Sequence, residues 1–158
     1  FKLAMRTLDI FRASVAGAAL GMGRRALQDA LAHVKSRQMF GQHLADFQIT
    51  QSRLGDMAAL LESAALLTYR AAWLRDTAGS DEAAATAYTQ AAAMAKFTAT
   101  ENASKVIDMS LQMHGGLGVM VGNKLESLYR DIRSLRIYEG ASEVQQLIIG
   151  KSVLKGAP

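Results

Sequence analysis

The 158-residue sequence predicts an all-α fold, an antiparallel four-helix bundle with a broken last helix. Apolar residues recur at three- and four-residue intervals over long stretches, which is the period of an amphipathic helix. Proline occurs once, at the last position, and several stretches are rich in alanine, a strong helix former. Three long helical segments followed by two short ones make a single-domain bundle the simplest architecture.

The first helix is expected over residues 7–36, where an apolar stripe is formed by Leu8, Phe11, Val15, Ala18, Met22, Ala26, Ala30 and Val34. Gly17, Gly21 and Gly23 interrupt this helix. Glycine inside a helix costs about 1 kcal/mol relative to alanine, so their grouping indicates a close approach, either by a neighbouring helix or by a ligand. Gly41 is the predicted terminator of the helix.

The second helix is expected to run from Asp46, a plausible N-cap, to about Asp76. Residues 77–80 are typical of a turn, and Ser80 is the predicted N-cap of a third helix that ends near Met113. These two helices complete the long part of the predicted bundle.

A glycine-rich segment, residues 114–119, ends the third helix and allows the backbone to approach a ligand closely. A short helix is expected over residues 124–135, followed by a corner at 138–141. Ser142 and Gln145 have the spacing of a capping box, so the final helix is expected to start at Ser142 and to run to about residue 154.

Composition argues against several classes of function. Lysine and arginine number 18 against 14 aspartates and glutamates, a net charge of +4 that is spread along the helices, so nucleic-acid binding is not expected. No apolar run is long enough to span a bilayer, and no signal peptide is recognisable. The chain has no cysteine, and His33, His43 and His114 lie far apart without a Glu-x-x-His partner, so no metal site is expected.

Glu139 is the main functional signal. It lies between Tyr138 and Gly140, just before a helix start, so its carboxylate is held on a short corner. A helix start offers unpaired N–H groups and a positive dipole end, which suit a phosphate-bearing ligand. Many surface helices begin in this way, so the pattern alone leaves a purely structural role open.

Other candidate residues also have structural alternatives. Asp9 and Arg12 are three residues apart on one helix face and could form an ordinary salt bridge. Arg37 complements a helix dipole, and Gln112 could cap a helix C-terminus. Their combination, rather than any one of them, favours a functional site.

Four motifs follow one another along the chain. They are Arg37-Gln38-Met39-Phe40-Gly41 with Phe47-Gln48 after it, Gln112-Met113-His114-Gly115-Gly116, Leu128-Tyr129-Arg130-Asp131-Ile132-Arg133, and Ile137-Tyr138-Glu139-Gly140-Ala141-Ser142-Glu143. In this order and spacing the chain resembles, nearly end to end, the C-terminal helical domain of the acyl-CoA dehydrogenases, in particular the short- and medium-chain-like branch. Residues 1–9 resemble the segment that leaves the middle β-domain of that family.

The resemblance implies an FAD enzyme that converts a saturated acyl-CoA to a trans-2-enoyl-CoA. Glu139 falls on the catalytic base of the family, which removes the α-proton of the thioester while the β-hydrogen leaves as hydride to the flavin. The α-proton of a thioester is weakly acidic, so the carboxylate needs a dry site and the thioester carbonyl needs hydrogen-bond donors. In the family, the backbone N–H of Glu139 is one of those donors.

The resemblance also implies which residues contact the ligands. Those that match FAD-binding positions, some of them reaching the flavin of a neighbouring subunit, are Arg37, Phe40, Gln48, Gln112, Gly115, Gly116, Ala141, Ser142 and Glu143. Those that match substrate-binding positions are Asp9, Arg12 and Gly140. The family usually has threonine where Ala141 stands. Some members place the base at the position of Phe11, which cannot accept a proton, and this favours Glu139 as the base.

The partners implied by the resemblance are an acyl-CoA, an electron-transfer flavoprotein as acceptor, and further copies of the chain in a homodimer or homotetramer. The implied location is a bacterial cytoplasm or the mitochondrial matrix. The alternatives are an acyl-CoA oxidase relative, in which reduced flavin meets oxygen, and a non-catalytic helical oligomerisation module. Because the family fold places an N-terminal helical domain and a β-domain first, residues 1–158 are expected to be a fragment that is inactive alone.

Overall fold

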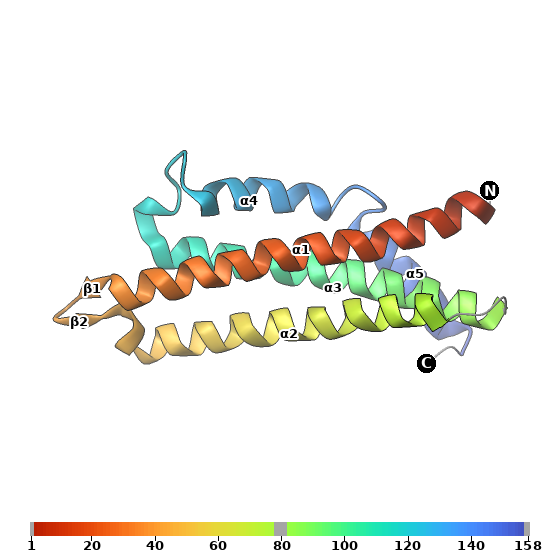
Figure 1. Ribbon diagram of the computed structural model, residues 1–158, viewed down its shortest axis with the longest axis horizontal. Coiled ribbons are helices and arrows are strands. Elements are labelled where there is room, and N and C mark those ends of the chain that lie inside the picture. Colours follow the sequence, from red (N-terminus) through yellow and green to blue (C-terminus); the bar gives the residue numbers. More distant parts are fainter. Residues whose placement is uncertain (1, 78–81, 157–158) are drawn as a thin grey trace.

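The computed structural model describes residues 2–77 and 82–156, with side chains from Thr7 onward, and it confirms the all-α class (Figure 1). The helices are α1 Lys2–Ser36, α2 Gln48–Thr77, α3 Glu82–His114, α4 Lys124–Leu135 and α5 Ser142–Leu154. Between α1 and α2 lie the strands β1 Gln38–Met39 and β2 Gln42–His43 and the 3-10 turn η1 Leu44–Asp46, and a second 3-10 turn, η2 Gly115–Leu117, follows α3.

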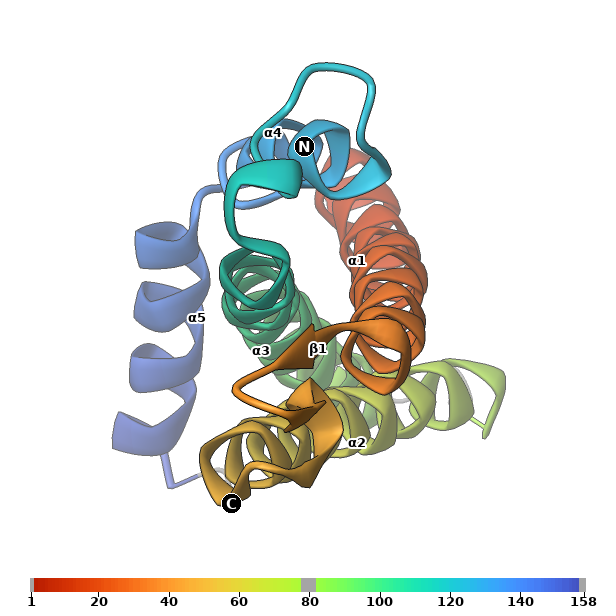
Figure 2. The same ribbon diagram turned by 90° about the vertical axis from the view of Figure 1, so that its left-hand side faces the viewer.

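The helix α3 is the centre of the bundle, because α1, α2, α4 and α5 all pack against it (Figure 2). The helices α1 and α3 share the most extensive contact, and α2 runs antiparallel to both (Figure 1). The short helix α4 lies over α1 and α3, whereas α5 lies on the other side of α3 and is inclined to the bundle. The last helix is therefore broken as predicted, and its two pieces cover different faces of α3.

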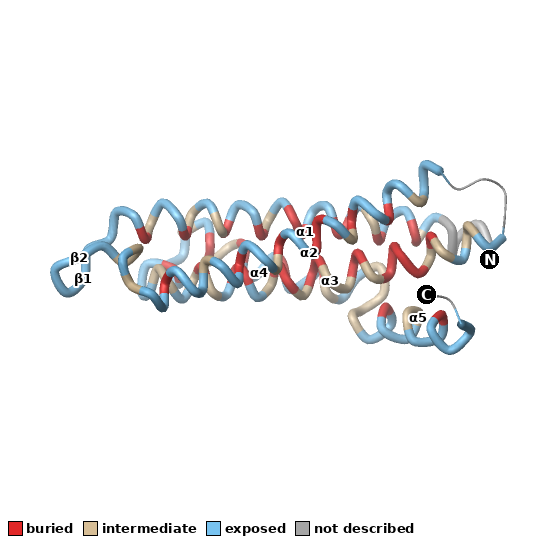
Figure 3. Tube along the Cα trace, turned by 90° about the horizontal axis from the view of Figure 1, so that it is seen from below, coloured by how far each residue is buried: buried red, intermediate tan, exposed pale blue. Residues whose placement is uncertain are grey.

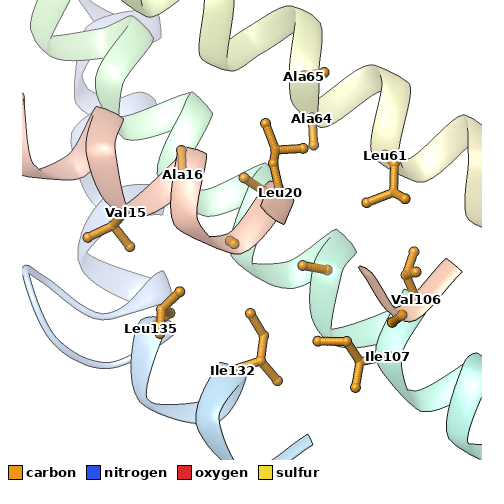
Figure 4. Close-up of a cluster of buried hydrophobic side chains, with 14 of the residues drawn as sticks. Val15, Ala16, Leu20, Leu61, Ala64, Ala65, Val106, Ile107, Ile132 and Leu135 are labelled. Carbon is orange, nitrogen blue, oxygen red and sulfur yellow. The ribbon is translucent and has the colours of Figure 1, made fainter. Parts of the chain in front are cut away.

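The core is made largely of small side chains. Alanines of the three long helices are completely buried, among them Ala16, Ala19, Ala26, Ala64, Ala95, Ala99 and Ala103. Figure 3 shows the buried positions repeating along the inner sides of these helices, and Figure 4 shows larger side chains such as Ile107 and Ile132 filling the space beside them. Small residues allow the helix axes to approach closely, so the alanine-rich composition has a packing cause.

Gly23 marks the tightest of these contacts. A Cβ atom at Gly23 would lie 2.6 Å from a methyl carbon of Leu61 on α2 and 3.3 Å from the Cβ of Ala103 on α3. We therefore expect Gly23→Val to lower the free energy of unfolding by about 1–3 kcal/mol, because the side chain forces three helices apart. The measurement is thermal unfolding of the protein that carries this domain, by calorimetry.

The matched control for this prediction is Gly17→Ala on the same helix. Nothing lies within 4 Å of a Cβ built at Gly17, so this change should be neutral or should raise the free energy of unfolding by roughly 0.5–1 kcal/mol through helix propensity. Equal destabilisation by both variants would contradict the packing role of Gly23.

The predicted end of the first helix at residue 36 is confirmed, because α1 ends at Ser36. Two residues predicted to mark helix ends do not do so. Gly41 does not terminate α1, because it lies in the turn between β1 and β2. Phe40 and Gly41 have φ angles of 51° and 80°, the pair of left-handed conformations that a tight two-residue hairpin requires. Asp46 does not cap α2, because it belongs to η1 and accepts a hydrogen bond of 3.0 Å from the backbone N–H of His43.

The predicted start of α5 at Ser142 is confirmed, but the predicted capping box is wrong. Ala141 occupies the N-cap position and makes no side-chain cap, and the hydroxyl of Ser142 donates to Glu101 of α3. The sequence also predicted a turn at residues 77–80 and an N-cap at Ser80. Residues 78–81 lie outside the described residues. Within the parts of the chain that are described, no helix has the length and apolarity needed to cross a bilayer.

Candidate active site

The corner between α4 and α5 has an unusual backbone. Glu139 has a φ angle of 57° and Gly140 one of 89°. The left-handed region costs a residue with a side chain about 1 kcal/mol or more, so the surroundings must hold Glu139 there. At the next position glycine is required, because a Cβ on Gly140 would lie 2.6 Å from the Gln145 amide nitrogen. The partly buried Glu139 carboxylate thus projects from a tightly constrained turn.

Side chains from two other helices hold this corner. Lys96 of α3 donates to the carbonyl oxygens of Tyr138 and Gly140, each at 2.6 Å. Gln145 of α5 donates to the carbonyl oxygens of Glu139 and Gly140, at 3.3 and 2.8 Å. All three consecutive carbonyls are therefore bonded, whereas the backbone N–H of Glu139 has no acceptor among the described residues.

The two predicted substrate residues on α1 form a buried ion pair. Arg12 donates to the carboxylate of Asp9 at 2.6 Å, and the side chains are only 3% and 6% exposed. Thr89 donates to the second carboxylate oxygen of Asp9, and Tyr88 donates to its backbone carbonyl. Little of either side chain is open to a ligand, although the buried Nε of Arg12 has no partner in the described parts of the chain.

Lys96 links this ion pair to the corner. Burial lowers the pKa of the Lys96 ammonium below its ordinary value, and the charge of Arg12 lowers it further, whereas the carboxylate of Glu139 opposes both effects. Arg12, Lys96 and Glu139 therefore share one electrostatic neighbourhood, built from α1, α3 and the α4–α5 corner.

A second cluster lies beside the start of α5. Glu101 of α3 accepts hydrogen bonds from the Ser142 hydroxyl and from the Arg136 guanidinium. Burial tends to raise the pKa of Glu101, but the hydrogen bonds from Ser142 and Arg136 outweigh it and hold that pKa below its ordinary value. Glu143 is exposed, and together with Ser142 it lines a hollow of about 350 Å³ next to this cluster. Ala141 is partly buried between the corner and the helix.

The other predicted cofactor residues gather at the far end of the bundle, around the hairpin and η2 (Figure 1). Arg37, Gln112, Gly115 and Gly116 line one pocket of about 740 Å³. Phe40 stands at the tip of the hairpin with 89% of its surface exposed, and Gln48 is exposed at the first position of α2. The structure thus divides the predicted residues into two groups, one around Glu139 and one at the hairpin end.

The residues of the hairpin-end pocket fit an anionic ligand with a flat group. Arg37 supplies a cation, and Gln112 supplies an amide with both a donor and an acceptor. Nothing lies within 4 Å of a Cβ built on Gly115 or Gly116, so the backbone there faces open space. The rings of His33 and His114 stack with centroids 4.1 Å apart at the same pocket.

Three contributors to the site were missed from the sequence: Lys96, Glu101 and the corner-holding role of Gln145. Lys96 did carry a signal, because it lies four residues after Ala92 and three before Ala99, on the buried stripe of α3. A charged residue on an apolar stripe needs a buried partner. The partners of Glu101 are side chains distant in the sequence, and those of Gln145 are local backbone carbonyls, and no periodicity indicates either kind. In the described part of the chain, no group of three histidine, aspartate or glutamate side chains is placed to hold a metal ion.

Comparison with known proteins identifies the family. Residues 1–154 match the acyl-CoA dehydrogenase C-terminal domain. The chain is 41% identical over 155 residues to the caffeyl-CoA reductase–Etf complex subunit CarC of Acetobacterium woodii, covering 98% of this chain and 39% of that protein. It is 42% identical over 155 residues to the mitochondrial short-chain specific acyl-CoA dehydrogenase of Bos taurus, covering 98% of this chain and 36% of that protein.

Solved structures agree. Butyryl-CoA dehydrogenase from Megasphaera elsdenii superposes with a TM-score of 0.90 at 36% identity, covering 98% of this chain and 38% of that chain. A glutaryl-CoA dehydrogenase from Mycobacterium smegmatis in complex with FADH2 superposes with a TM-score of 0.84 at 25% identity, covering 96% of this chain and 37% of that chain. The chain therefore belongs to the acyl-CoA dehydrogenase family, as a C-terminal helical domain of that family.

Proposed function

We propose that this chain is the C-terminal domain of an FAD-dependent acyl-CoA dehydrogenase in which Glu139 is the base that removes the α-proton of an acyl-CoA thioester. The observation that carries the proposal is the corner itself. It presents a carboxylate from Glu139 together with the backbone N–H of the same residue, which has no acceptor among the residues that the structure describes. The φ angle of 57° makes this conformation costly. Strained backbone of this kind is concentrated at functional sites.

The two groups of Glu139 have complementary tasks in such a reaction. The carboxylate takes the α-proton, and the N–H donates to the thioester oxygen on which negative charge develops. Both groups belong to one residue, so fixing its backbone fixes the N–H and the direction in which the carboxylate side chain leaves the corner. Gly140, which takes the φ angle of 89° that the corner needs, is proposed to lie against the substrate.

Asp9 and Arg12 are proposed to contact the substrate, although both side chains are buried. The Nε of Arg12 has no partner within the described ranges of the chain, and it can donate to a ligand oxygen only if the surrounding side chains move slightly, because the arginine is 3% exposed.

FAD would be held by two groups of residues. Ser142 and Glu143, with Ala141, lie at the start of α5 next to the proposed base. The hairpin-end pocket, with Arg37, Phe40, Gln48, Gln112, Gly115 and Gly116, would hold the diphosphate and adenosine portions of the flavin of a neighbouring subunit. When bound, the flavin supplies the acceptor for the β-hydride. Because the two groups lie apart in one chain, cofactor binding in this proposal requires a homodimer or homotetramer.

The chain spans 36–39% of the length of the relatives described above. We propose that the activity belongs to a longer protein that contains this chain. We propose an electron-transfer flavoprotein as the electron acceptor, a partner that the name of the CarC complex mentions for that relative. The relatives include bacterial and mitochondrial proteins, and a bacterial cytoplasm or mitochondrial matrix remains our prediction for this chain.

The test is to purify the longer protein that contains this chain and to mix it anaerobically with butyryl-CoA. The expected results are a bound flavin, bleaching of its visible absorption, and turnover with an electron-transfer flavoprotein that exceeds turnover with oxygen. Faster turnover with oxygen would identify an oxidase instead. Absence of flavin and of bleaching by acyl-CoAs of any length would support a non-catalytic oligomerisation module and refute the proposal.

A further inference from the structure

Lys96 is the most deeply buried charged side chain near the proposed active site. Its side chain lies within α3 at 1% exposure, and its ammonium donates to the carbonyls of Tyr138 and Gly140. Within the described residues its bonded partners are therefore neutral carbonyls, and no carboxylate forms a salt bridge with it. A lysine in such a position lowers the stability of the fold, because burial disfavours the charged ammonium and, among the described residues, no carboxylate is bonded to it.

The two carbonyls that Lys96 binds are the ones that flank Glu139. The carbonyl of Tyr138 shares its peptide plane with the N–H of Glu139, so the ammonium fixes that N–H directly. The carbonyl of Gly140 belongs to the peptide plane that follows Gly140, so the ammonium also holds the chain just after the residue with a φ angle of 57°. Gln145 binds the carbonyl between them and shares that of Gly140. The carbonyls of the corner point to donors on α3 and α5, and its Glu139 N–H has no acceptor in the described part of the chain.

A simple structural alternative is that Lys96 only satisfies carbonyls beyond the end of α4. A neutral donor does that without burying a charge, as Gln145 shows for the carbonyls of Glu139 and Gly140. The lysine adds a cation beneath the corner, close enough for the carboxylate of Glu139 to influence the pKa of the ammonium. It also adds hydrogen bonds to the residues on both sides of Glu139.

We propose that Lys96 is a positioning residue for the reaction, which sets the direction of the Glu139 carboxylate and N–H by binding the carbonyls of Tyr138 and Gly140. This inference rests on the proposed function, because it gives Lys96 a task only if Glu139 is the base. The consequence is specific: loss of Lys96 slows removal of the α-proton more than it weakens substrate binding, since a small misplacement of a base costs rate.

The experiment uses the full-length, FAD-loaded protein and the variant Lys96→Met, which keeps the length and removes the donors. The limiting rate of flavin reduction by butyryl-CoA, per bound flavin, should fall about 10- to 100-fold, and the apparent Kd for butyryl-CoA should change less than about threefold. The kinetic isotope effect of α-deuterated butyryl-CoA should rise, whereas that of β-deuterated butyryl-CoA should not. Lys151→Met, an exposed lysine of α5, is the control and should behave like the wild type.

The outcomes separate the two proposals. If Glu139→Gln abolishes reduction but Lys96→Met reduces at the wild-type rate with unchanged isotope effects, the positioning role is wrong and the base assignment stands. If Glu139→Gln reduces normally, both are wrong. Should Lys96→Met lose its flavin, Lys96→Gln, which is too short to reach both carbonyls, is measured in the same way. Loss of flavin from both variants would show a purely structural role and would also overturn the inference.

Discussion

Replacing Glu139 by glutamine is expected to leave the full-length protein folded and yellow but to slow its reduction by acyl-CoA by at least about 10²-fold, and by up to about 10⁴-fold. Glutamine has nearly the shape of glutamate and keeps the same backbone N–H, so the corner held by Lys96 and Gln145 should persist. Only the ability to take the α-proton is removed. Anaerobic stopped-flow spectroscopy of the flavin with butyryl-CoA measures this rate directly.

The control for this prediction is Glu62→Gln, which makes the same chemical change on the exposed face of α2 and should not alter the rate. Flavin content and the affinity for acyl-CoA should be unchanged in both variants. A Glu139→Gln protein that is reduced as fast as the wild type would show that another group accepts the proton. Phe11, at the position where some members of the family carry the base, cannot take over this role.

Shortening Ile107 to alanine is expected to lower the free energy of unfolding by about 2–5 kcal/mol. Ile107 is completely buried in α3, where it packs beside Val106 and faces Ile132 of α4 (Figure 4). The three carbons removed leave a cavity that helices of this length cannot close by local adjustment. Because α4 leads into the corner at Glu139, the loosened contact should also reduce the fraction of flavin-loaded protein.

Thermal unfolding followed by circular dichroism measures the first effect, and the flavin-to-protein absorbance ratio measures the second. The control is Val121→Ala, which trims an aliphatic residue that is 92% exposed in the loop before α4. Its melting temperature should match that of the wild type. If both variants melt alike, the contact between α3 and α4 does not carry the stability that the burial of Ile107 indicates.

The candidate site was predictable wherever its residues form a continuous motif. Glu139 and Gly140 lie in one such motif, and the structure gives both of them positive φ angles. Arg37 and Gln112, far apart in sequence, come from two motifs, and they line one pocket. Local patterns were less informative about hydrogen-bond partners. Ser142 and Gln145 have the spacing of a capping box, yet their side chains bond elsewhere because stronger partners lie on α3 and in the corner.

The ends of helices were also poorly predicted from local patterns. Gly41 was predicted to terminate a helix, but it lies in a hairpin turn that needs two adjacent residues with left-handed backbone conformations. Phe40 is the other residue of that turn. Asp46 was predicted to cap α2, but it belongs to the 3-10 turn η1, where its carboxylate accepts a hydrogen bond from the backbone N–H of His43. In both places the choice depends on how the chain must reverse between two long helices, which is a property of the packed bundle.

Helix periodicity and motif spacing are local, and they were enough to predict the helical class, the helical segments and the position of Glu139 just before the last of them. That α3 is the central helix, with α4 and α5 on different faces of it, became visible only in the packed bundle. The same holds for the place of Lys96 beneath the corner, 42 residues before Tyr138 in the chain. Contacts over that distance depend on how whole helices pack, and burial of the apolar stripes, not local propensity, sets that packing.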